Sequence, residues 1–442
     1  MSESSHLIRI KGEIASSYPD FEERVTQAWA DILVELKKVT QEISAGGSEF
    51  IPQVQFSELQ NLPADKIAEI RRKGCLVIKD IVDDEQAIAW KKSLEDFVSN
   101  NPDVDGFPLD DKQFYQLYWT KSQLEARSHP NMLAASAWLN NLYHAEAGQK
   151  LDGVDLSSPL SYADRFRIRH PGTVWTTFPP HVDGTLIERW EDPAFRSCFA
   201  DIFSGQWRKH DPFALTGRVS AQNSLHGRLN QSSIFRAFQG WLAMSETAPT
   251  ERTLKVFPGL LLSNPYLILR PFFRLLVASD SQEVWDPKSW AFDVSSADFP
   301  GLIPLDGAWR GPLPTPELHP NLLLETTMVS VPKVYPGDAV FWHGDLIHSV
   351  EKEHAGRGDS AVMYIAAVPT TPLNQAYIER QKESFLKAVT PPDYPAQAKP
   401  ENALVGFGKA GDILNPPGRK AMGLTYFCGL MSFCSVVSST SI

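Results

Sequence analysis

The chain has 442 residues, of which 43% are hydrophobic and 11% aromatic, so it can bury a large core in roughly one to three domains. Its formal net charge of -11 disfavours partners whose phosphates must be neutralised, which argues against nucleic acid and acidic membrane surfaces. Four cysteines without a CxxC pair indicate neither a disulfide framework nor a zinc site, and the polar N-terminus lacks a signal or transit pattern. We therefore expect a cytoplasmic globular protein.

The N-terminal third is predicted to be rich in helices. Apolar residues recur every three or four positions from about Glu23 to Ile43, which is typical of an amphipathic helix, and the pattern ends at Gly46-Gly47. Next come a helix stopped by a glycine, a short buried strand, and a helix followed by a proline: residues 65–74, 75–82 and 83–102. We expect residues 1–60 to form a helical extension in front of the core domain.

From about residue 160 the pattern changes to short β-like runs separated by proline and glycine, which is typical of a sandwich or barrel. The runs are RFRIRH (165–170), FRAFQGWLAM (235–244), TLKVFPG (253–259), TTMVSVPKV (326–334), DAVFWHG (338–344), LIHSVE (346–351) and SAVMYIAAVP (360–369). Insertions at about 190–230 and 259–320 separate them and are predicted to be lids or substrate loops. Residues 61–423 are thus predicted to form the main domain, and 424–442 an apolar, Ser-rich tail.

Three H-x-D/E pairs occur: His144-Ala145-Glu146, His181-Val182-Asp183 and His343-Gly344-Asp345. Two imidazoles and one carboxylate commonly hold mononuclear iron(II), and residues two apart on an extended strand point to the same side. The first pair falls in a segment that the sequence predicts to be helical, where such residues diverge. The second pair stands at the end of a predicted strand, just before a glycine turn, so a metal ion could approach it.

A third ligand must come from a distant strand. Residues 336–350 (PGDAVFWHGDLIHSV) begin with a turn that includes Asp338 and continue as a strand to His348. A competing set takes His343, Asp345 and His348 from this one segment. In a regular strand, however, 343 and 345 share one face and 348 takes the other, unless a bulge intervenes. We favour His181, Asp183 and His348 as ligands; ordinary polar histidines remain the third interpretation.

These motifs resemble the iron(II)/2-oxoglutarate dioxygenase superfamily, especially its phytanoyl-CoA-hydroxylase-like branch. The blocks DRFRIRHPG, HVDGTLIERWEDP, FQGWLAMSE, FWHGDLIHSVE and VMYIAAVP are similar to the YbiU-like family of oxygenases over roughly residues 60–423. The resemblance implies an α+β fold with a mainly β, double-stranded β-helix (jelly-roll, cupin-like) core. It also implies Fe(II) held by His181, Asp183 and His348, and 2-oxoglutarate as co-substrate. The intact carboxylate of Asp183 then points to hydroxylation or desaturation rather than halogenation.

The distal carboxylate of 2-oxoglutarate normally pairs with an arginine or lysine. In the relatives this base often begins the strand after the distal histidine, but here that strand contains none. Arg357 is the nearest base and our first candidate, followed by Arg236 and Arg167, with a solvated strand face as the other interpretation. The aromatic residues near the motifs are predicted to pack in the core or to wall a substrate pocket: Trp175, Trp190, Trp241, Phe341 and Trp342.

Two other functions fit the same motifs. A cupin-like metal-binding or non-oxidative jelly-roll protein would keep the fold without 2-oxoglutarate chemistry. An iron oxidase that uses O₂ without 2-oxoglutarate would release no succinate.

Overall fold

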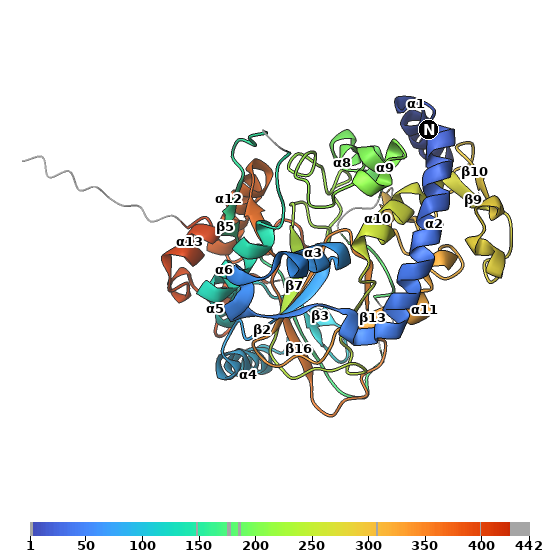
Figure 1. The fold of residues 1–442 in the computed structure, drawn as a ribbon. Coiled ribbons are helices and arrows are strands. Elements are labelled where there is room, and N and C mark those ends of the chain that lie inside the picture. The colour runs from blue at the N-terminus through green and yellow to red at the C-terminus, as the bar shows by residue number, and fades with distance from the viewer. Residues whose placement is uncertain are drawn as a thin grey trace, which may run out of the picture.

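The computed structural model describes residues 3–146, 149–174, 178–183, 187–305, 308–397 and 399–424. The protein is a mixed α/β molecule built on one large sheet, in which every neighbouring pair is antiparallel except β1 and β2 (Figure 1). In spatial order its strands are β1 (Gln53–Gln55), β2 (Cys75–Lys79), β14 (Ala339–His343), β7 (Phe238–Ala243), β16 (Ser360–Tyr364), β6 (Phe166–Arg169), β4 (Phe114–Tyr115) and β3 (Gly106–Phe107).

A second, smaller antiparallel sheet has β8 (Leu254–Val256) between β13 (Val329–Ser330) and β15 (His348–Val350). A β-bridge between His181 and His348 adds one more segment beside β15. Three strand pairs lie outside these sheets: β5 (Asp155–Leu160) with β17 (Val368–Thr370), β9 (Phe273–Leu275) with β10 (Trp290–Phe292), and β11 (Ile303–Leu305) with β12 (Ala308–Arg310).

From β6 onward the chain passes back and forth between the two main sheets. It runs from β6 in the large sheet to the His181 segment beside the small one, back to β7, and then to β8 and β13 of the small sheet. It returns to β14, crosses to β15 and ends in β16. The chain therefore crosses repeatedly between the two sheets, and both sheets contribute side chains to the space between them.

The central strands are buried on both faces, which explains their continuous apolar sequences. Every residue of β7 and of β14 is buried. Gly240 of β7 has no room for a side chain, because a Cβ there would lie 2.4 Å from Cδ1 of Phe341. The turn before β14 is held by Asp338, whose carboxylate accepts hydrogen bonds from the backbone N–H groups of Tyr335 and Asp80, both at 2.9 Å. Asp338 is thus a turn residue, as the sequence predicts.

The amphipathic helix predicted for residues 23–43 is confirmed as α2 (Phe21–Gly46), which follows α1 (Glu3–Ser17). Its Trp29 indole stacks on the ring of Phe273 at 4.6 Å and on that of Tyr266 at 5.1 Å, and meets Trp290 edge-on at 5.2 Å. These partners belong to α10 (Leu260–Leu269) and to β9 and β10, beside which α2 runs in Figure 1. The N-terminal helices are therefore packed on the second predicted insertion.

Most of the other predicted helices are present. α3 (Ala64–Lys73) ends at Gly74, which has a φ of 74°, and α4 (Asp84–Asn100) begins at Asp83, whose side chain accepts the N–H of Gln86 at 3.2 Å. α12 (Pro372–Leu386) follows β17 near the C-terminus. The remaining helices are α5 (Lys121–Ser128), α6 (Pro130–Asn140), α7 (Glu188–Glu191), α8 (Pro193–Ser197), α9 (Ala200–Phe203), α11 (Leu324–Thr327) and α13 (Pro416–Ala421).

The helical prediction for His144 and Glu146 is wrong. α6 ends at Asn140, and His144 instead forms a parallel β-bridge with Ala214. Tyr143 holds the chain in this position. Its buried hydroxyl donates to the carbonyl oxygen of Ala237 at 2.8 Å, and its ring packs 5.1 Å from that of Phe213. The predicted tail lies outside the described residues from 425 onward.

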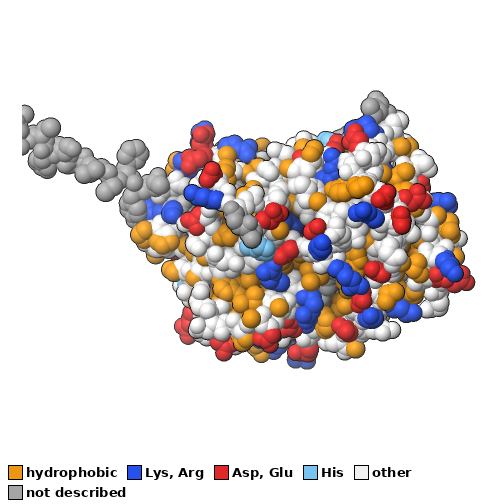
Figure 2. All heavy atoms as spheres, turned by 45° about the horizontal axis from the view of Figure 1, so that its top comes forward, with side chains coloured by type: hydrophobic (Ala, Val, Ile, Leu, Met, Phe, Trp, Pro, Cys, Tyr) orange, Lys and Arg blue, Asp and Glu red, His pale blue; other side chains and the backbone are white. Residues whose placement is uncertain are grey.

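On the face shown in Figure 2, acidic and basic side chains are interspersed, and neither sign forms a continuous field. Within the described ranges, none of the helices combines the length and the apolar content needed to cross a bilayer.

Candidate metal centre and its cavity

Two histidines that are far apart in the sequence lie directly opposite each other. The N–H of His181 donates to the carbonyl of His348, and the N–H of His348 donates to the carbonyl of His181, both at 2.9 Å. Residues that exchange both backbone hydrogen bonds across antiparallel segments have Cα atoms about 5.5 Å apart. The pairing of β15 with the segment that ends at Asp183 therefore brings the two imidazoles together, with ring centroids at 4.3 Å.

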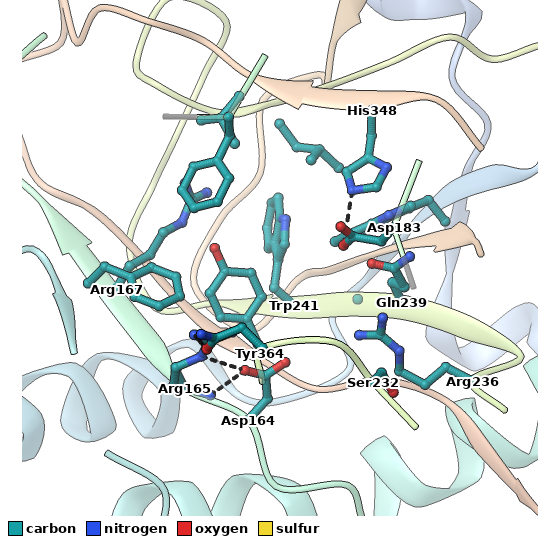
Figure 3. A pocket seen from close by; sticks show the side chains of 18 of the residues that line it. Asp164, Arg165, Arg167, Asp183, Ser232, Arg236, Gln239, Trp241, His348 and Tyr364 are labelled. Atoms are coloured by element: carbon teal, nitrogen blue, oxygen red, sulfur yellow. Dashed lines mark hydrogen bonds and ion pairs between the residues drawn. The ribbon is translucent and has the colours of Figure 1, made fainter. Parts of the chain in front are cut away.

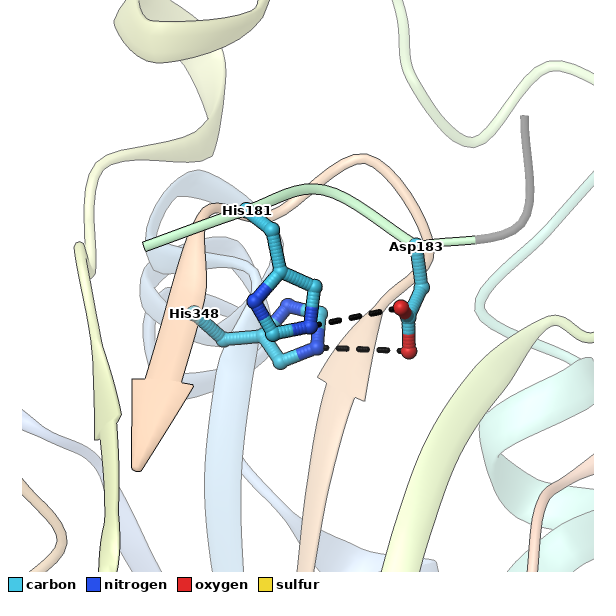
Figure 4. Close-up of side chains that lie close together, drawn as sticks. All are labelled: His181, Asp183 and His348. Atoms are coloured by element: carbon cyan, nitrogen blue, oxygen red, sulfur yellow. Dashed lines mark ion pairs between the residues drawn. The ribbon is translucent and has the colours of Figure 1, made fainter. Parts of the chain in front are cut away.

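The carboxylate of Asp183 completes a three-residue cluster (Figure 4). Its Oδ1 lies 3.3 Å from Nε2 of His181, and its Oδ2 lies 3.4 Å from Nε2 of His348. The ligand atoms of all three residues lie within 4.8 Å of one another. Ligands about 2.1 Å from one metal ion and at right angles to each other lie about 3 Å apart, so this spacing suits a shared ion. Within the described residues this is the group of side chains arranged to hold a metal.

The backbone fixes which nitrogen of each ring faces the cluster. Nδ1 of His181 lies 2.6 Å from the carbonyl oxygen of Pro179, and Nδ1 of His348 lies 3.0 Å from that of Leu346. A carbonyl can only accept, so each Nδ1 carries a proton, and Nε2 is the atom that each ring turns toward Asp183 and could offer to a metal ion. This carbonyl-held orientation is the one that metal-binding histidines usually adopt.

The charge states also suit a metal site. Burial and the neighbouring His181 lower the pKa of His348, although Asp183 opposes them, so the neutral imidazole that binds metals is favoured. Desolvation acts to raise the pKa of Asp183, but the two imidazoles hold it well below its usual range. The cluster therefore offers the neutral imidazole of His348 and the ionised carboxylate of Asp183, and Nε2 of His181 completes the set of possible ligand atoms.

The competing set of His343, Asp345 and His348 does not assemble. Both oxygens of Asp345 are taken by arginines, since Oδ1 lies 2.9 Å from Nη2 of Arg189 and Oδ2 lies 2.7 Å from Nη2 of Arg218. His343 is fully buried, and its Nε2 lies 3.2 Å from the carbonyl oxygen of Pro212. Asp345 is thus the centre of a buried ion-pair network and His343 a core residue.

The cluster opens into a cavity of about 480 Å³ (Figure 3), within the roughly 300–1,000 Å³ typical of small-molecule sites. Of the aromatic residues singled out in the sequence, Trp241 and Trp342 line this cavity. Trp190 is instead buried with its Nε1 donating to the carbonyl of Ile268 at 3.0 Å. Phe341 packs over Gly240 in the large sheet, and Trp175 lies outside the described residues.

Of the three candidate arginines, two line the cavity and one does not. Arg357 is exposed and is absent from the cavity lining, so its selection as first candidate needs correction: the loop between β15 and β16 turns it to solvent. Arg167 on β6 and Arg236 just before β7 both line the cavity. Arg167 is 1% exposed, and its Nε and Nη1 have no hydrogen-bond partner in the described part of the chain. Burial lowers its pKa, although Tyr364 and Glu351 act to raise it.

Several cavity residues were not singled out from the sequence. Asp164 pairs with the neighbouring Arg165, with its Oδ1 3.1 Å from the arginine Nε. Gln239 lies two residues before Trp241, so the period-2 pattern of β7 could have placed both on the same face. Phe107 and Phe114 come from the N-terminal strands β3 and β4, and nothing in their local sequence indicates a role in a site so far along the chain.

Comparisons with known proteins give a consistent relationship. A family model described as Gig2-like matches residues 4–424. Escherichia coli K12 YbiU is 29% identical over 430 residues, which cover 94% of this chain and 95% of YbiU. The crystal structure of GlcNAc Inducible Gene 2 from Candida albicans has a TM-score of 0.83 and 32% identity, covering 95% of this chain and 90% of that one. A Salmonella typhimurium LT2 protein named as a candidate oxidoreductase has a TM-score of 0.76 and 28% identity, covering 95% and 97%. The predicted relationship to YbiU is confirmed.

Proposed function

The chain belongs to the Gig2-like family, and on that premise we propose that it is a non-haem iron(II)- and 2-oxoglutarate-dependent dioxygenase that hydroxylates or desaturates a small organic substrate. One observation carries the proposal: a cluster of two histidines and one aspartate shares a cavity with the buried guanidinium of Arg167, which forms no ion pair with a described residue and whose Nε and Nη1 lack hydrogen-bond partners there. The oxidoreductase name of the Salmonella relative agrees with a redox function.

A double-stranded β-helix is the core that we propose for this enzyme. The alternation of β6, the His181 segment, β7, β8, β13, β14, β15 and β16 between the two sheets supports it, because a jelly roll places eight strands in two facing sheets. It also puts the proposed ligands on neighbouring segments of the small sheet and Arg167 on the large one. A ligand between the sheets would then be reached from both sides.

Iron(II) suits the donor set, since two imidazoles and a carboxylate on one side leave positions open for co-substrate and O₂. When bound with 2-oxoglutarate, the metal supplies the oxidation of a substrate C–H bond by O₂, with conversion of 2-oxoglutarate to succinate and CO₂. The protein's part is to hold the donors and to keep the reaction in an apolar enclosure. The rings of Phe114, Phe178, Trp241, Trp342 and Tyr364 form much of that enclosure.

Arg167 is the side chain that we propose as the anchor for the distal carboxylate of 2-oxoglutarate. An unpaired buried charge is unfavourable, so a guanidinium kept in this state is matched to a ligand that brings the opposite charge. Its fork of N–H donors pairs well with a carboxylate. Arg167 and the metal cluster line the same cavity, with Arg167 on the far side of it from Asp183 (Figure 3).

The decisive experiment is an anaerobic titration with iron(II) and 2-oxoglutarate. We expect a weak visible charge-transfer band and, after O₂ is admitted with substrate, succinate. Metal binding without the band would support the cupin-like alternative, and substrate oxidation without succinate would support an oxidase that does not use 2-oxoglutarate.

Replacement of the anchor gives a sharper test. Loss of a buried carboxylate–guanidinium pair is worth about 2–3 kcal/mol, so Arg167→Ala should raise the 2-oxoglutarate concentration needed for half-saturation of the band by about one to two orders of magnitude. Arg167→Lys should recover part of the loss, because it restores the charge without the fork. Arg357→Ala is the control, since this exposed arginine does not line the cavity. An unchanged requirement in Arg167→Ala would reject this anchor.

A further inference from the structure

A second guanidinium lines the cavity at the metal end. Arg236 borders the main cavity and also a smaller one of about 40 Å³, which it shares with Asp183, Ser232 and Gln239. In Figure 3, Arg236, Gln239 and Asp183 lie on one side of the cavity, while Arg167 lies across it beyond Trp241 and Tyr364. The two arginines therefore face different parts of the enclosed space, and one small ligand at Arg167 would leave Arg236 available.

Arg236 forms no ion pair with a described residue, and its guanidinium lies near the Tyr162 ring, whose centroid is 5.8 Å from Cζ. Arg165 provides the contrast. Its guanidinium is paired with Asp164, lies 3.2 Å from Oδ1 of Asn230, and stacks on the ring of Tyr394 at 4.6 Å. Arg165 is thus already neutralised, and the charge of Arg236 is not.

The residues that line the cavity carry more positive than negative charge. Three arginines and two aspartates border the cavity, which leaves one positive charge when the histidines are neutral. Iron(II) and the 2-oxoglutarate dianion cancel each other, so their binding would not remove it. An uncompensated positive charge in the cavity favours a ligand that carries negative charge.

Uncharged polar groups in the cavity wall also favour a ligand that accepts hydrogen bonds. Nε1 of Trp241, Nε1 of Trp342 and Oγ of Ser232 are buried without a hydrogen-bond partner among the residues that the structure describes. An indole N–H can only donate. Unmatched donors in a cavity favour a ligand that is rich in acceptors, while the surrounding aromatic rings favour an apolar body.

We propose that the substrate is a small organic anion whose carboxylate or phosphate group pairs with Arg236, with its apolar body against the aromatic wall. This inference rests on the proposed function for the role of the bound molecule as substrate. The anion-binding role of Arg236 itself depends only on the cavity.

The test compares three probes of similar size by calorimetric titration of the metal-loaded protein, without O₂ and with saturating 2-oxoglutarate to occupy Arg167. The probes are phenylacetate, phenyl phosphate and the neutral phenylacetamide. We expect at least one anion to bind ten or more times more tightly than the amide, and its identity distinguishes a carboxylate from a phosphate site. Arg236→Gln should abolish this preference but leave 2-oxoglutarate binding intact, and Arg357→Gln should change neither.

The outcomes separate this inference from the proposed function. Equal binding of amide and anions, absence of anion binding, or an unchanged preference in Arg236→Gln would overturn the inference, even if the iron–2-oxoglutarate band forms. A preference that Arg236→Gln removes supports the anion site. If that result comes with no band, the site stands and the oxygenase proposal fails.

Discussion

The buried carboxylate of Asp345 offers a quantitative test of the ligand assignment. His343, Asp345 and His348 lie within six positions of the sequence. In the structure, however, the carboxylate of Asp345 forms ion pairs with two arginines. The change Asp345→Ala removes the shared counter-charge of Arg189 and Arg218. It touches none of the three proposed metal ligands.

The expected loss of stability follows from the burial of all three partners. The side chains of Asp345, Arg189 and Arg218 are 3%, 5% and 6% exposed, so water cannot replace the lost carboxylate. Loss of one partner of a buried pair costs about 3–5 kcal/mol, and since two guanidinium groups are stranded here, we expect the upper end, about 5 kcal/mol. Asp359→Ala is the matched control: its contacts with Lys91 and His170 are both partly exposed, so the loss should be about 1 kcal/mol or less.

Urea denaturation followed by circular dichroism measures the loss of stability, and iron(II) titration of the folded variant measures metal stoichiometry. We expect Asp345→Ala to unfold at a clearly lower urea concentration and still bind one metal ion where it is folded. A variant as stable as the control that has lost its metal would refute the reasoning and restore Asp345 as a ligand.

Two further predictions concern other sites. His348→Ala or His181→Ala should reduce bound iron(II) to background in elemental analysis with little change in circular dichroism, whereas His144→Ala should leave the metal in place. Burial raises the pKa of Glu401 from 4.5 to about 7, so the folded protein retains a proton that the unfolded chain releases, and the free energy of unfolding should fall by about 3 kcal/mol as the pH rises between these values. Glu401→Gln should flatten that part of the pH profile.

Each of these two predictions has an outcome that would contradict it. Retention of a full complement of iron by His348→Ala would remove that residue from the ligand set. An identical pH profile for Glu401→Gln and the parent protein would show that Glu401 releases its proton at the same pH in both states.

The sequence predicts those helices and strands whose apolar residues follow a regular pattern along the chain. The apolar stripe of α2 and the continuous apolar runs of β7 and β14 record burial directly, so they identify these elements without knowledge of their partners. The spacing of His181 and Asp183 likewise encodes a shared face, and backbone pairing brings His348, which the sequence also proposes as a ligand, beside them.

The anchor could not be predicted in the same way. Arg357 was chosen by its distance along the chain from His348, but its side chain faces solvent. Alternation places Arg167 and Arg169 on one face of β6, yet all residues of β6 are buried, so the pattern does not say which face borders a cavity. Nor can a sequence show that the indole N–H of Trp241 lacks a partner, because that depends on three-dimensional neighbours.

The contact of Trp29 with the rings of Tyr266, Phe273 and Trp290 has a consequence for how this architecture can vary. A chain shortened to start after Gly46 would turn these three rings toward water and leave a sticky, aggregation-prone face. We therefore expect a homologue that lacks this helix to lack the insertion as well, or to have polar residues in place of these three rings.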